Sequence, residues 1–197
     1  MIDQIEDAMI ARMKAAATPE ILGYTYGSCE TYDGEIDEDR LIELANRAPA
    51  AWLVFAGDKE HRRAGGTRYV TGTFVVLLAA RSLRNQADAR RGSGDRVGAY
   101  QMTRDVIALI DGRKLGLDLV EPLKFTERRT LFSKRTRQTF AAVYAVTFTC
   151  IYALPAHPDA LDDFAAVAGD WELPGAPPSQ DFEADYQADP DDSPLDA

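Results

Sequence analysis

Apolar and polar residues alternate along two long stretches of the chain, which predicts two unusually long β-strands. The stretches run from Arg68 to Arg81 (RYVTGTFVVLLAAR) and from Gln138 to Tyr152 (QTFAAVYAVTFTCIY). Each would extend to roughly 45 Å at the usual rise of a strand, whereas most strands stop at about five or six residues. We expect these strands to cross the whole domain.

Three helices are predicted from apolar residues at helical spacing. The first, Ile2 to Ala16, has acidic residues near its start and basic residues near its end, as the helix dipole favours. A short helix is expected from Ile36 to Arg47, stopped by Pro49. Another amphipathic helix is expected from Ala99 to Asp111, followed by a glycine that suits its end.

The remaining strands are shorter in this interpretation. Ile21 to Tyr32 is expected to be a strand, and Ala50 to Ala56 a buried one. The segment from Gly57 to Thr67 then reads as a basic, glycine-containing loop that closes a hairpin with the first long strand. Residues 117–132 show a weaker pattern, in which Pro122 restricts any strand to a sheet edge or a strand start.

The order of these elements predicts an α+β fold. We expect a mixed, mainly antiparallel sheet, covered on one side by the two amphipathic helices. Residues 1–154 would form this domain, with a polar excursion at 82–98 that is either mobile or partly helical. Residues 155–197 hold seven of the ten prolines and would form an acidic, disordered extension, apart from a helical pattern at 159–171.

Charge divides the chain at the same place. All 22 Lys and Arg residues lie at or before Arg137, while residues 155–197 hold 12 of the 32 acids. The first 154 residues therefore carry a formal charge of +2 and the extension −12. The extension can be a solubilising tail, a segment that pairs with arginines of an adjacent subunit, or a mimic of DNA.

Catalytic and metal-binding patterns are largely missing from the sequence. The two histidines, His61 and His157, are too few for a histidine metal site or an easily built Ser-His-Asp set. The stretch RGSGDRVG lacks the Lys-Ser or Lys-Thr of a Walker loop and the spacing of the dinucleotide-binding fingerprint. Cys29 and Cys150 are expected to be reduced, partly buried thiols. We therefore expect no enzyme activity, no cofactor and no metal.

Basic residues gather in three places, and each group has two interpretations. They are solvated loops, or they form a positive rim that meets an acidic protein surface or DNA phosphates when several copies assemble. With two apolar residues of the extension, they supply the candidate assembly residues: Arg62, Arg63, Arg68, Arg128, Arg129, Lys134, Arg135, Arg137, Phe164 and Trp171.

The N-terminal segment is unlike a secretory signal, and no stretch approaches the apolar length of a membrane span. We therefore expect a soluble protein made in the cytoplasm, with no membrane partner.

Several segments resemble the Mu-like prophage tail protein family. They are the opening helix at Ile2 to Ala16, the Tyr-Asp-Gly-Glu turn at Tyr32 to Glu35, the short helix from Leu41 to Pro49, and the apolar strand from Trp52 to Ala56. The resemblance covers about residues 1 to 154, so the acidic extension departs from it.

The resemblance implies a tail terminator: a small α+β protein that forms a hexameric ring, caps the tail tube, stops its polymerisation and offers a surface to the head connector. Its partners would be itself, the tube protein, the sheath protein and the connector, with DNA passing through the ring. It would lie at the head-proximal end of the tail. A different neck or baseplate component, or a small module that binds nucleic acid or a phosphate ligand, stays open as an alternative.

Overall fold

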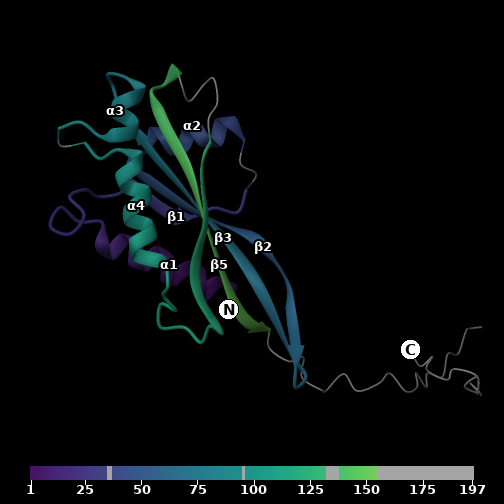
Figure 1. The fold of residues 1–197 in the computed structure, drawn as a ribbon. Helices are drawn as coiled ribbons and strands as arrows, with labels where there is room; N and C mark the ends of the chain where they lie inside the picture. Colours follow the sequence, from purple (N-terminus) through teal and green to yellow (C-terminus); the bar gives the residue numbers. More distant parts are fainter. Residues whose placement is uncertain (35–36, 95, 132–137, 155–197) are drawn as a thin grey trace, which may run out of the picture. The chain divides into compact units, whose positions relative to one another are not determined.

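The computed structural model describes residues 1–34, 37–94, 96–131 and 138–154, and they form an α+β fold (Figure 1). A five-stranded sheet has the order β1-β2-β3-β5-β4. Only β1 and β2 are parallel, and the other neighbours are antiparallel. The strands are β1 (Ser28–Thr31), β2 (Ala50–Ala64), β3 (Thr67–Arg81), β4 (Glu121–Thr130) and β5 (Ala141–Leu154). The predicted fold class is confirmed.

The helices begin and end close to where the sequence indicates. They are α1 (Ile2–Ala16), α2 (Glu38–Asn46), α3 (Gln86–Arg91) and α4 (Ala99–Ile110). At the start of α2, the Asp37 carboxylate accepts a hydrogen bond of 2.8 Å from the Arg40 backbone N–H, which satisfies one of the free amides of the first turn. Of the two alternatives for residues 82–98, the structure shows the partly helical one, since α3 lies within them.

The long central strands form an unbroken ladder. β3 and β5 pair over fourteen consecutive positions, from Arg68 opposite Leu154 to Arg81 opposite Ala141, without a register shift. The irregular positions lie instead between β2 and β3 and between β4 and β5. Since β2 and β4 lie on the outer sides of this ladder, the regular centre fixes the register of the whole sheet.

Successive side chains along each strand point to opposite faces of the sheet, so the core consists of two apolar clusters, one on each face. Phe74, Phe148 and Tyr152 belong to the first cluster, together with apolar residues of α1 and α4. Trp52, Leu77 and residues of α2 belong to the second. The prediction that the two amphipathic helices share one face is therefore confirmed, while α2 covers part of the opposite face.

Three predicted boundaries are wrong. The expected loop from Gly57 to Thr67 is mostly strand, because β2 continues to Ala64 and the turn is only Gly65-Gly66, with φ angles of 56° and 78°. β5 begins at Ala141 and not at Gln138, since Phe140 adopts a left-handed φ of 50°. The strand predicted from residue 21 is only β1, four residues long.

The weaker pattern at 117–132 is explained by its position. It contains β4, the outermost strand, with Pro122 second in the strand. Proline is tolerated there because an outer strand has a side without a hydrogen-bonding neighbour. Arg128 and Arg129 lie within this strand, close to its end.

Adjacent positions of β3 should respond very differently to truncation. Phe74 is fully buried and packs its ring 5.3 Å from that of Phe55, whereas Thr73 lies on the opposite face and is partly exposed. We expect Phe74→Ala to lower the free energy of unfolding by about 3–5 kcal/mol, and Thr73→Ala by less than about 1 kcal/mol. Urea denaturation measures both, and equal losses would contradict this two-faced sheet.

Alkaline pH should destabilise the fold. Burial raises the pKa of Cys29 to about 11 and that of Cys150 to about 12, from an ordinary value of 9.0. Burial likewise raises the pKa of Tyr24 from 10.0 to about 12. At a pH between the ordinary pKa of such a group and its raised pKa in the folded protein, the unfolded chain has lost a proton that the folded chain still holds. The free energy of unfolding is therefore at its full value below about pH 9 and falls above it.

Each such group contributes up to about 1.4 kcal/mol per pH unit in its window. Denaturation midpoints measured from pH 8 to about pH 11 should therefore decrease steadily. A midpoint that stays constant or rises over this range would contradict the burial of these groups.

Candidate assembly surface

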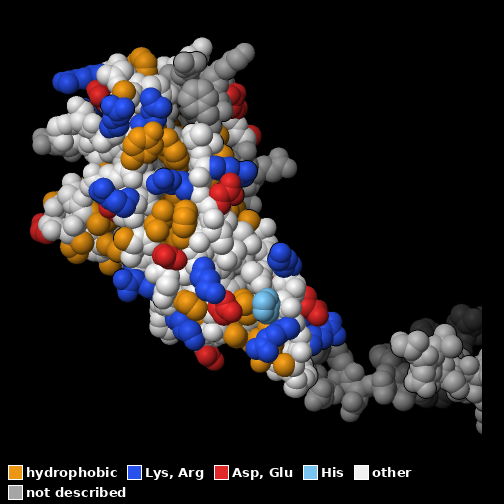
Figure 2. Space-filling model, viewed as in Figure 1, with side chains coloured by type: hydrophobic (Ala, Val, Ile, Leu, Met, Phe, Trp, Pro, Cys, Tyr) orange, Lys and Arg blue, Asp and Glu red, His pale blue; other side chains and the backbone are white. Residues whose placement is uncertain are grey.

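The far end of the β2–β3 hairpin lies outside the core. Among the described residues, none from Ala56 to Tyr69 belongs to either apolar cluster. We call residues 56–69 the hairpin end. Figure 2 shows Lys and Arg side chains gathered where the hairpin end lies.

Three of the predicted candidate residues meet at the hairpin end. Arg63 and Arg68 are directly opposite each other in the two strands, and Glu60 lies between them. The Glu60 carboxylate accepts a hydrogen bond of 3.0 Å from Nε of Arg63 and lies 3.5 Å from Nε of Arg68. The hydrogen bond from Arg63 lowers the pKa of Glu60. The glutamate thus offsets the repulsion between two like charges that face each other.

Arg62 is held differently. Its guanidinium group lies 4.8 Å from the centre of the Tyr69 ring, a cation–π contact across the two strands. Among the described residues, no carboxylate lies within ion-pair distance of Arg62 or of Lys59. Both cations therefore remain available to an anionic partner.

A hydrogen bond across β3 fixes the base of the hairpin end. The Tyr152 hydroxyl of β5 donates a 2.7 Å hydrogen bond to the Asp58 carboxylate of β2. Between these two strands lies Gly72 of β3, where an added Cβ would come within 2.7 Å of the Tyr152 ring. Burial, and then the hydrogen bond to Asp58, raise the pKa of Tyr152. The glycine thus lets the ring cross β3 to reach β2.

The structure does not bring the other predicted candidates to the hairpin end. Arg128 and Arg129 lie on β4, which borders β5 and is separated from β2 by two strands. Their side chains lie on opposite faces, and Arg128 donates a 3.2 Å hydrogen bond to the Thr103 hydroxyl of α4. Five further candidates lie outside the described residues: Lys134, Arg135, Arg137, Phe164 and Trp171.

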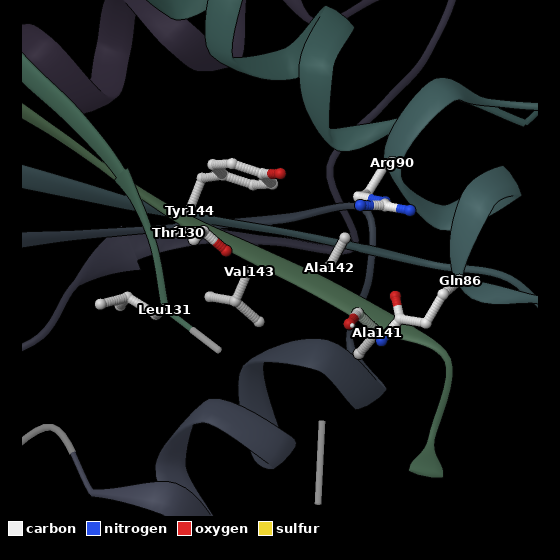
Figure 3. Close-up of a pocket in the computed structure, with 8 residues that line it drawn as sticks. All are labelled: Gln86, Arg90, Thr130, Leu131, Ala141, Ala142, Val143 and Tyr144. Carbon is white, nitrogen blue, oxygen red and sulfur yellow. Dashed lines mark hydrogen bonds between the residues drawn. The ribbon is translucent and has the colours of Figure 1, made fainter. Parts of the chain in front are cut away.

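A small hollow lies beside the end of β4, where no described strand pairs with Ala141 and Ala142 of β5 on that side (Figure 3). Its volume is about 210 Å³, and Ala141, Ala142 and Val143 of β5 line it. On the helix side are Arg90 and Gln86 of α3, whose amide donates a 3.0 Å hydrogen bond to the Ala141 carbonyl. The hollow is below the roughly 300–1,000 Å³ of ligand pockets, so it suits a partner's side chain more than a small molecule.

Aromatic residues missed by sequence reasoning lie beside this hollow. The Tyr144 ring lines it and meets the Tyr100 ring of α4 edge to face, with 5.7 Å between ring centres. Tyr100 is 44% exposed. Tyrosine next to arginine is typical of protein interfaces. Tyr144 lies on the face of the sheet that α1 and α4 cover, as the alternation along β5 requires. Nothing local in the sequence shows that β4 ends beside it.

The described residues do not assemble a metal site. Within them, no group of three or more His, Cys, Asp or Glu side chains is arranged to hold a metal ion. Cys29 and Cys150 are buried and unpaired with each other. None of the helices described here is both long and apolar enough to cross a membrane.

Comparison with known proteins yields one family. Residues 1–153 match the family described as Bacteriophage Mu, Gp37. No curated protein matches the chain.

Replacing Gly72 should loosen the hairpin end. We expect Gly72→Ala to push the Tyr152 ring away from Asp58 and to cost more stability than Tyr152→Phe, which removes only the hydrogen bond. That hydrogen bond contributes about 1–3 kcal/mol because one partner is charged. Denaturant unfolding gives the two losses, and hydrogen exchange of the amides of residues 57–64 shows whether opening is local. A harmless Gly72→Ala would contradict the close approach.

Proposed function

The chain belongs to the bacteriophage Mu Gp37 family, and from this premise we propose that it is the tail terminator of a phage. Membership in this family indicates a structural component of the virion. The finer role is our proposal: a ring of copies, six in number, caps the tail tube, stops its polymerisation and presents a joining surface to the head connector.

The hairpin end is the observation that carries this proposal. It contributes no residue to the apolar clusters. The Tyr152–Asp58 hydrogen bond nevertheless holds its base, and the Glu60 carboxylate offsets the repulsion between Arg63 and Arg68, which face each other. A segment that is kept ordered without contributing to the core is explained by contact with another molecule. A tail terminator needs such contacts both around its ring and along the tail axis.

The hollow beside Tyr144 supplies a second, different surface. A ring closes through head-to-tail contacts, in which one patch of each copy meets a different patch of the next. The hollow and the hairpin end differ in composition, since small apolar residues of β5 and Tyr144 line the hollow beside a single arginine, whereas several Lys and Arg residues gather at the hairpin end. Two unlike patches suit this type of contact.

Nucleic-acid binding as the main function is supported less well. Two of the cations at the hairpin end already share Glu60, and Lys124 is paired with Glu121. We propose that DNA passes through the ring without being recognised. The other proposed partners are the tube protein, the sheath protein and the connector, and the proposed location is the head-proximal end of the tail.

Two measurements test the role. Native mass spectrometry of the purified chain should show a closed ring, with six copies as the expected number. Electron microscopy of particles made without the protein should show tails of irregular length that fail to join heads. Tails of normal length that join heads normally would reject the terminator role, and labelling of the protein at the baseplate end would reject the proposed location.

A further inference from the structure

The outer edge of β2 is largely without a neighbouring strand. β1 pairs only with the first four residues of β2, Ala50 to Leu53. From Val54 to Ala64, no described strand pairs with that side of β2. An unpaired edge presents backbone N–H and C=O groups to any extended segment that fits it.

Side chains along this edge restrict what fits. Lys59 is opposite Thr71, and Arg62 is opposite Tyr69, so both cations lie on the face that carries α2 but beyond that helix. A second copy of this edge would bring the same two cations, Lys59 and Arg62, and β4 carries its own pair of arginines. Like charges directly opposite destabilise strand pairing, so the edge selects an acidic strand.

One segment of the chain has this pattern. Residues 181–189 read DFEADYQAD, and they contain neither proline nor a basic residue. Apolar and polar residues alternate strictly through most of it: Phe182, Ala184, Tyr186 and Ala188 against Glu183, Asp185, Gln187 and Asp189. In an extended strand, four carboxylates would share one face, since Asp181 has the same parity as Glu183, Asp185 and Asp189. The segment lies outside the described residues and outside the residues that match the family.

We propose that residues 181–189 of a neighbouring copy bind along the outer edge of β2, with their carboxylates beside Lys59 and Arg62. The inference rests on the proposed ring, because the ring supplies the neighbouring copy. The charges are complementary, and no strand among the described residues pairs with the outer side of β2 over residues 54–64, which is longer than the segment.

The length of the chain allows this contact between copies. β5 ends at Leu154, which pairs with Arg68 near the turn of the hairpin. The 26 residues from 155 to 180 then reach at most about 90 Å when extended. Tethering in a ring also raises the local concentration of the segment to roughly the millimolar range, so a weak contact is sufficient.

A labelled peptide of residues 181–189 tests the edge directly. The receptor is the full chain carrying Glu183→Gln, Asp185→Asn and Asp189→Asn, so that its own segment does not compete. We expect binding at low ionic strength that weakens about tenfold or more at about 0.5 M salt. Lys59→Gln with Arg62→Gln in that receptor should weaken binding by a similar factor. Arg113→Gln with Lys114→Gln, an equal charge change elsewhere, should leave binding unchanged.

The backbone part of the contact needs its own control. A peptide with the same side chains but methylated amides at alternating positions keeps its charge and loses its ability to pair with a strand. We expect it not to bind. Equal binding of the methylated peptide, or equal binding to the Lys59/Arg62 and Arg113/Lys114 variants, would overturn the proposal.

Mixing two variants tests whether the contact joins different copies. The Lys59/Arg62 variant keeps its acidic segment, and the Glu183/Asp185/Asp189 variant keeps its edge, so each should associate less alone and pair when mixed. Failure of the mixture to pair would overturn binding between copies. Circular dichroism confirms that both variants are folded. A ring that forms without peptide binding rejects only this inference, whereas the absence of any ring together with normal tails rejects the proposed function.

Discussion

The continuous pairing of β3 with β5 is the constraint on which the rest of this structure depends. Fourteen residue pairs without a bulge hold the two strands in one register, and that register sends alternate side chains to opposite faces. Because a shift by one residue would exchange the two faces, both apolar clusters depend on this ladder. The same ladder carries Tyr152 to the position from which it reaches Asp58 on β2.

The outer strands follow a different rule. Irregular pairing is confined to β2 and β4, and these strands carry most of the charged side chains of the sheet. Bulges and charges are common means by which proteins prevent unwanted pairing at sheet edges. In this chain they leave a rigid centre whose borders are selective, which suits a protein that contacts particular partners and must not polymerise through its own sheet.

Much of this arrangement could be predicted from the sequence, because the signals are local. In α1 and α4 the apolar residues lie on the buried face of the helix, and in β3 and β5 they alternate with the residues of the other face. These patterns can be read from the sequence because they follow directly from which side chains are buried. The second half of β2 could not be predicted, since residues such as Lys59 and Arg62 resemble a solvated loop and are held in a strand only by their partners on β3.

The hollow beside Tyr144 could not be predicted for a similar reason. It arises where β4 ends, and no short sequence pattern encodes that position. The clustering of Arg62, Arg63 and Arg68 was predicted because the turn at Gly65-Gly66 brings them together locally.

The pairing of β3 with β5 also has a consequence for how the chain acquires its structure. Arg68 meets Leu154, a partner 86 positions later, so the middle of the sheet cannot close until nearly all of the domain has been synthesised. Contacts between such distant positions form slowly, since a long loop must be ordered first. Until then β3 has one apolar side without its neighbour, and a nascent chain in this state is prone to aggregation. The strand order therefore sets a period during synthesis in which the apolar residues of β3 are exposed, and this period ends only when β5 has been made.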